Sequence, residues 1–131
     1  MAGCLLRASG LNFDVESFLK GSALRPAVVY KKGQRRRPAS RGPQTASGFN
    51  AVVSAREDSL ESQVAEALSF VRTNTAELQR LRKFPGVDEV VLDFACPQGE
   101  IATRSARFPA ELLATAGGLG VDIHLSFYLV G

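Results

Sequence analysis

Residues 121–129 read Val-Asp-Ile-His-Leu-Ser-Phe-Tyr-Leu and have the cleanest alternation of apolar and polar residues in the chain. Successive side chains of a β-strand point to opposite faces, so this stretch predicts a strand with one buried and one wet face. The residues expected to face the core are Val121, Ile123, Leu125, Phe127 and Leu129. One-sided strands are typical of antiparallel sheets, so the stretch favours an α+β fold with helices packed on one face of a mostly antiparallel sheet.

Other strands are predicted at 4–9, 27–30, 48–54 and 89–96, where apolar and β-branched residues lie between glycine and proline. On the strand at 89–96, we expect Glu89, Val91, Asp93 and Ala95 to face away from the core. Helices are predicted at 15–20 after an Asp14 cap, from Asp58 or Ser59 to Val71, at 76–83 after a kink, and from Pro109 with Leu112 and Leu113 inward.

The resulting order, β-α-β-β-α(α)-β-α-β, gives a sheet of about five strands with a ferredoxin-like core in its first six elements. In that layout the first and fourth strands are antiparallel neighbours. Cys4 begins the first strand and Cys96 ends the fourth, so the two thiols are expected to lie close together.

Length, composition and cysteine count restrict the class of protein. A chain of 131 residues fits one domain over 1–131, and its 45% of hydrophobic residues is ordinary for a globular protein. No apolar run is long enough to span a membrane and the start has no signal-peptide core, so we expect a cytoplasmic protein with no membrane contact. Two cysteines are too few for a disulfide framework or a four-ligand zinc site.

The charge is unevenly placed along the chain. Residues 1–60 carry ten Lys and Arg against four Asp and Glu, whereas residues 61–131 carry six against nine. Much of the excess lies in 31–47, which has no large apolar residue and is predicted to be a long, mobile loop. Its cations are the first candidate binding residues: Lys31, Lys32, Arg35, Arg36, Arg37 and Arg41.

The outward face of the sheet supplies the second candidate set: Glu89, Asp93, Asp122, His124 and Tyr128. Asp122, His124 and Ser126 are the residue types of a hydrolase triad. Alternate positions on one strand lie roughly 6.5–7 Å apart, too far for a proton relay. His124 is the sole histidine in the sequence, so no pair of histidines can bind a metal. We therefore predict no catalytic residue, metal or cofactor, and binding rather than catalysis.

Short blocks of the sequence resemble a bacterial family of small stand-alone domains of unknown function. The blocks are 11–19, 24–33, 47–50, 108–113 and 120–125, and the resemblance covers nearly the whole chain. It implies a bacterial source and carries no assigned activity. Domains of this size sometimes act as immunity proteins beside secreted toxins.

Three functions from different classes stay open at this point. The first is a protein-interaction module, with toxin neutralisation as one form, using the basic loop or the polar sheet face. The second is nucleic-acid binding through the cations of 31–41. The sheet is not expected to bind nucleic acid, because the first and third strands present no outward aromatic for base stacking. Their outward positions are Leu5, Arg7, Ser9, Asn50, Val52 and Ser54.

The third function is an enzyme of unrecognised type, assembled from Asp93, Glu100, His124 and Tyr128. A homodimer is a separate expectation. The sheet has an open face and an edge, and Val52, Val91 and Tyr128 are its outward apolar positions.

Overall fold

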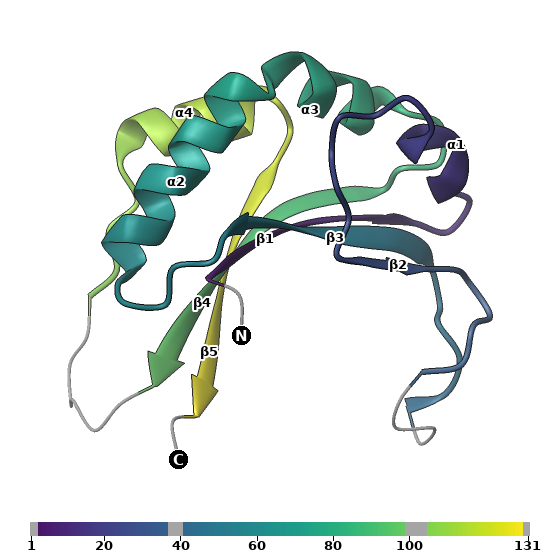
Figure 1. Cartoon of the computed structure of the whole chain (residues 1–131), viewed down its shortest axis with the longest axis horizontal. Helices are drawn as coiled ribbons and strands as arrows, with labels where there is room; N and C mark the ends of the chain where they lie inside the picture. Colours follow the sequence, from purple (N-terminus) through teal and green to yellow (C-terminus); the bar gives the residue numbers. More distant parts are fainter. Residues whose placement is uncertain (1–2, 37–40, 99–104, 130–131) are drawn as a thin grey trace.

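The computed structural model describes residues 3–36, 41–98 and 105–129, although not the side chains of residues 97, 98 and 129. These residues form five strands and four helices (Figure 1). In chain order the elements are β1 (Cys4–Gly10), α1 (Val15–Leu19), β2 (Val28–Tyr30), β3 (Ser47–Ser54), α2 (Leu60–Thr73), α3 (Thr75–Lys83), β4 (Glu89–Gln98), α4 (Ala110–Gly118) and β5 (Asp122–Leu129).

The strands form one sheet in the order β2-β3-β1-β4-β5. β1 is antiparallel to both β3 and β4, and β2 is antiparallel to β3, so the first six elements have the predicted ferredoxin-like arrangement. β5 lies parallel to β4 because α4 carries the chain back across the sheet between them. The most clearly alternating stretch is therefore the one parallel strand of a mostly antiparallel sheet.

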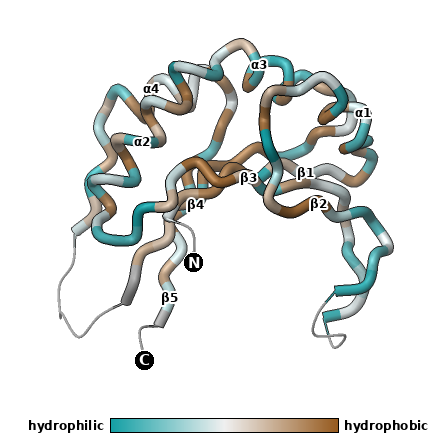
Figure 2. The backbone as a smooth tube through the Cα atoms, in the orientation of Figure 1, coloured by the Kyte–Doolittle hydropathy of each residue, from teal (hydrophilic) through white to brown (hydrophobic). Residues whose placement is uncertain are grey.

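All four helices cover the same face of the sheet and leave the other face open (Figure 1). The core between the two layers contains four phenylalanines at the α1 end, where the rings of Phe18 and Phe49 are stacked with centroids 5.8 Å apart. Figure 2 shows that the central strands, which line this core, are hydrophobic and that the segment beyond β2 is hydrophilic.

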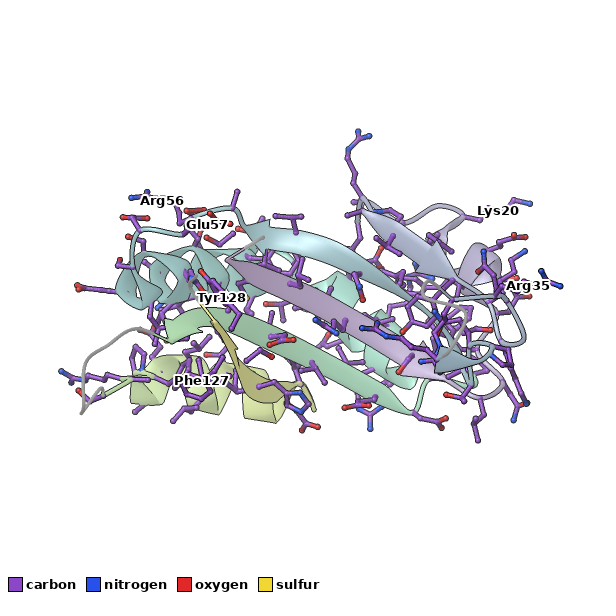
Figure 3. All side chains as sticks on the ribbon, turned by 90° about the horizontal axis from the view of Figure 1, so that it is seen from below. Lys20, Arg35, Arg56, Glu57, Phe127 and Tyr128 are labelled. Carbon is purple, nitrogen blue, oxygen red and sulfur yellow. The ribbon has the colours of Figure 1, made fainter. Side chains whose placement is uncertain are left out.

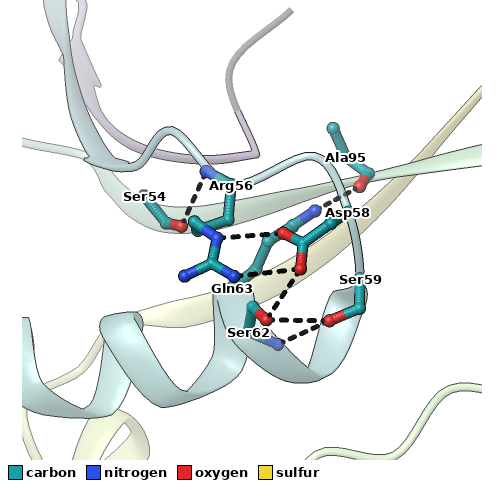
Figure 4. A network of polar contacts seen from close by, with 7 residues as sticks. All are labelled: Ser54, Arg56, Asp58, Ser59, Ser62, Gln63 and Ala95. Atoms are coloured by element: carbon teal, nitrogen blue, oxygen red, sulfur yellow. Dashed lines mark hydrogen bonds and ion pairs between the residues drawn. The ribbon is translucent and has the colours of Figure 1, made fainter.

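Local signals set the helix ends. The carboxylate of Asp14 accepts a hydrogen bond from the Ser17 backbone N–H and caps α1. Ser59, and not Asp58, caps α2 by accepting from Ser62. Asp58 instead pairs with Arg56 and accepts from the Ser62 hydroxyl, so both residues hold the start of α2 (Figure 4).

The predicted kink between the two middle helices is confirmed at Asn74. Its side-chain amide donates to the Phe70 carbonyl, and the Thr75 hydroxyl donates to the Val71 carbonyl, both at 2.9 Å. These side chains satisfy carbonyl groups at the end of α2 while the chain starts α3.

Cys4 and Cys96 are both buried, and they are not joined in a disulfide. Cys4 on β1 is paired with Phe94 on β4. Cys96 lies two residues further along β4, on the same face of the sheet as Phe94. Burial and the nearby Asp93 carboxylate raise the pKa of the Cys4 thiol, so it stays protonated.

Two core predictions are wrong. Phe127 shares the helix-covered side of the sheet with Cys96, yet its side chain is 60% exposed because β5 is an edge strand. Leu113 is 47% exposed, because α4 turns Leu112 and Ala116, one helical turn apart, toward the core. Leu129 ends β5, and its side chain lies outside the described residues.

Three outward predictions also need correction. Ser54 is buried, because a register shift between Cys4 and Leu5 changes which β3 residues face the core. Val91 and Asp93 face away from the helices but are buried as well. β4 lies between β1 and β5, so side chains from both neighbouring strands surround them.

Within the described residues, no helix has the length and apolar character needed to cross a bilayer.

Candidate functional site

Asp93 is the centre of a polar cluster on the open face of the sheet. It is 7% exposed, and its Oδ2 lies 2.9 Å from an Arg7 guanidinium nitrogen on β1. Its Oδ1 accepts a 2.6 Å hydrogen bond from the Ser126 hydroxyl on β5. A buried carboxylate needs such partners, so Asp93 fixes Arg7 in place and ties β1, β4 and β5 together.

Tyr30 joins this face from β2. It pairs with Gly48 on β3, and an added Cβ on Gly48 would lie 2.6 Å from the Tyr30 hydroxyl. The missing side chain lets the ring lie across β3 and form a hydrogen bond with Ser9 on β1. Burial raises the pKa of Tyr30, while the Ser9 hydrogen bond and the charge of Arg7 oppose that rise.

A hollow of about 200 Å³ on the open face is lined by Arg7, Ser9, Tyr30 and Asp93, among others. Of the predicted polar face, Glu89, Asp93 and His124 line it, and Asp122 and Tyr128 do not. Arg7, Ser9, Tyr30 and Ser126 were not predicted as site residues, because which residues surround them depends on strand order and register.

The pairing also decides the chemistry expected of β5. Ser126 donates its hydroxyl hydrogen bond to Asp93 on the neighbouring strand. It is therefore bonded to a residue other than Asp122 and His124, with which it shares the residue types of a hydrolase triad. Asp93 is paired with Arg7, and no group of three His, Cys, Asp or Glu in the described part of the chain could hold a metal ion.

The basic hairpin, defined here as residues 31–36 and 41–46, continues the ribbon formed by β2 and β3. Arg35 bridges Pro43, the Gly33 N–H donates to the Gln44 carbonyl, and the Gln44 N–H donates to the Gln34 carbonyl. These described residues therefore have ordered partners across the ribbon. The mobility expected of 31–47 stays a prediction.

The cations of the basic hairpin divide into two groups. Lys31 forms an ion pair with Glu16, and Arg36 donates to the Gly42 carbonyl at 3.1 Å, so these two hold the hairpin and its contact with α1. Lys32, Arg35 and Arg41 are exposed. Arg37 of the predicted basic set and Glu100 of the predicted enzyme set lie outside the described residues.

A second hollow, of about 250 Å³, lies against the basic hairpin. Its lining combines three arginines, Arg35, Arg36 and Arg41, with two glutamines and the three residues of β2. Val28 and Val29 of β2 are 52% and 40% exposed. The tube in Figure 2 changes here from hydrophobic along β2 to hydrophilic in the hairpin. Apolar and cationic surface therefore lie side by side at this edge of the sheet.

Comparison of the chain with curated proteins and with solved structures gives no match. A family described as a domain of unknown function, DUF4279, matches residues 2–130, which is nearly the whole chain. The resemblance seen in the short sequence blocks is thereby confirmed, and the chain belongs to the DUF4279 family.

Proposed function

We propose that this chain is a non-catalytic protein-binding domain that takes an acidic partner at the β2 edge of its sheet. The observation that carries the proposal is the hollow in which Arg35, Arg36 and Arg41 lie beside the exposed residues of β2. Arginine forms paired hydrogen bonds with carboxylates, and its rigid fork suits a protein surface rich in Asp and Glu.

The exposed valines favour a protein over a nucleic acid. Phosphate contacts need cations and hydrogen-bond donors, and unstacked bases need aromatic platforms. Val28 and Val29 serve neither purpose, whereas a protein interface buries apolar side chains inside a polar rim. The same residues suit an extended acidic segment whose apolar side chains contact Val28 and Val29 while its carboxylates reach the arginines.

Toxin neutralisation is one form that this function would take, since inhibitors of this kind bind through surface complementarity and charge rather than through chemistry. In this function residues 1–131 act as a single binding domain.

The test compares two labelled probes of equal length by fluorescence anisotropy: a peptide of alternating Glu and Val, and a single-stranded DNA oligonucleotide. We expect the peptide to bind more tightly. The double variant Arg35→Ala/Arg41→Ala should weaken peptide binding about tenfold, because each lost rim charge contributes about 0.7 kcal/mol. Arg36 is left in place because it holds the hairpin.

The matched control is Lys20→Ala/Arg25→Ala, which removes two exposed cations outside the basic hairpin. It should leave peptide binding nearly unchanged. A further variant, Val29→Ser, should weaken binding of the peptide and not of the oligonucleotide. Oligonucleotide binding that is tighter, falls steeply with salt and ignores Val29→Ser would reject the proposal in favour of nucleic-acid binding.

A tagged pull-down then seeks the natural partner, run with and without nuclease. A protein retained by the native chain after nuclease, and lost with Arg35→Ala/Arg41→Ala, would be the expected partner.

A further inference from the structure

The two edges of the sheet are protected very differently. β2 has three residues and is followed directly by Lys31 and Lys32, and short edges with lysines resist pairing with another chain. β5 has eight residues, and from Ile123 to Leu129 it contains no Lys, Arg, Asp, Glu or Pro. The strand order ends at β5, so within the described residues its outer backbone groups have no strand partner.

The side chains at this edge are apolar as well. Phe127 is 60% exposed and lies on the same side of the sheet as the helices. Figure 3 shows Phe127 and Tyr128 near the end of β5, far from Arg35 and the basic hairpin. The β5 edge is thus separate from the surface proposed for the acidic partner.

α4 extends the same apolar flank into the helix layer. It packs against α2 and β5, and in Figure 3 it runs along the β5 margin of the molecule. Its exposed residues include Ala110, Leu113, Ala114 and Gly117, which lie on one side at helical spacing. Its carboxylate, Glu111, forms an ion pair with Arg72 of α2 and so points away from that side.

We propose that the chain forms a homodimer in which β5 pairs with β5 of a second copy and the outer sides of the two α4 helices meet. Antiparallel pairing about a two-fold axis normal to the sheet gives one continuous sheet with all helices on one side. That symmetry brings together side chains of the same face. Phe127 of one copy then meets Ile123 or Leu125 of the other.

A second copy fits this edge better than an unrelated partner because the surface is self-complementary. An isologous interface joins the same surface patch of both copies, so a flank with charges of one sign would repel itself. Along β5 the carboxylate of Asp122 lies at the start of the strand, and the residues from Ile123 to Leu129 include no Lys, Arg, Asp or Glu. The apolar flank formed by Phe127 and Leu113 carries no such repulsion.

The experiment is sedimentation equilibrium of the full chain over a micromolar concentration series. We expect a monomer–dimer equilibrium. Phe127→Lys and Leu113→Lys should each raise the dimer dissociation constant by about tenfold or more, because each places one positive charge from either copy in an apolar interface. Both side chains are exposed, so circular dichroism should show the native fold in each variant.

Val52→Lys is the matched control, since Val52 is 47% exposed on the open face of β3. It should leave the dimer intact. Hydrogen exchange adds a direct readout: amides of β5 should become slower to exchange as the protein concentration rises, and amides of β2 should not. A chain that stays monomeric across the series, or a dimer lost with Val52→Lys and kept with Phe127→Lys, would overturn the proposal.

Discussion

Gly48 illustrates how one residue without a side chain positions part of the candidate site. It is buried on β3, between Tyr30 of β2 and Ser9 of β1. A Cβ added there would lie 2.3 Å from the Ala8 carbonyl oxygen and 2.6 Å from the Tyr30 hydroxyl. Real Cβ atoms do not approach backbone so closely, so glycine is needed for space rather than for an unusual backbone angle.

Gly48→Ala should destabilise the protein by about 1–3 kcal/mol, because the carbonyl of Ala8 is held in the sheet and cannot move away cheaply. Chemical denaturation of the native and variant chains measures this loss. Gly118→Ala is the control: nothing lies within 4 Å of its added Cβ, and alanine favours a helix, so stability should hold or rise. Equal stability of Gly48→Ala and the native chain would refute the steric account.

At the scale of elements, α1 and α3 are joined by a polar clamp over the phenylalanine cluster. Arg80 of α3 donates to the Phe18 carbonyl at 2.8 Å, and its guanidinium lies 4.1 Å from the centre of the Phe18 ring. Glu77 orients Arg80 through a 2.6 Å hydrogen bond and accepts another from Ser22. α1 has five residues and is too short to be stable alone, so such contacts hold it.

The clamp predicts a specific dependence of stability on pH. Its hydrogen bond from Arg80 lowers the pKa of Glu77 below the usual value of 4.5. A carboxyl whose pKa is lowered by folding adds stability above pH 4.5, and that contribution is lost as the pH falls through the folded value. Glu77→Gln should therefore cost about 1 kcal/mol at pH 7 and progressively less below pH 4.5.

Urea denaturation of both chains at pH 7, 4.5 and 3 measures the difference. Glu89→Gln, which removes an exposed carboxylate from β4, is the control. A deficit of Glu77→Gln that stays constant from pH 7 to pH 3 would show that the ionised carboxylate does not hold the clamp.

Element boundaries were predictable because their signals are local. The Asp14 cap and the kink at Asn74 each act within one helical turn, and the observed ends lie within a residue or two of the predicted ones. Exposure was less predictable. Alternation fixes the face on which Phe127 lies, but an edge position leaves that face partly uncovered.

At the scale of the whole molecule, the candidate site depends on pairings that are distant in sequence. Glu89, Asp93 and His124 were predicted to share a face because they alternate on their strands, and they line one hollow. Arg7 and Tyr30 join them only through the order β2-β3-β1-β4-β5, since each comes from a strand far away in the chain. No local pattern specifies which strands become neighbours.

That strand order predicts which backbone amides of the native sheet are protected from hydrogen exchange with solvent. β1 is paired on both sides, so its amides at Leu6 and Ala8 should exchange with solvent only by global unfolding. Amides of β2 should exchange fastest among the strands, because β2 has three residues and one partner. Hydrogen exchange with residue resolution tests this prediction. A separate measurement, calorimetry, should give one cooperative unfolding transition if residues 1–131 form a single domain. Faster exchange in β1 than in β2 would contradict the central position of β1, and two separate transitions would contradict one domain.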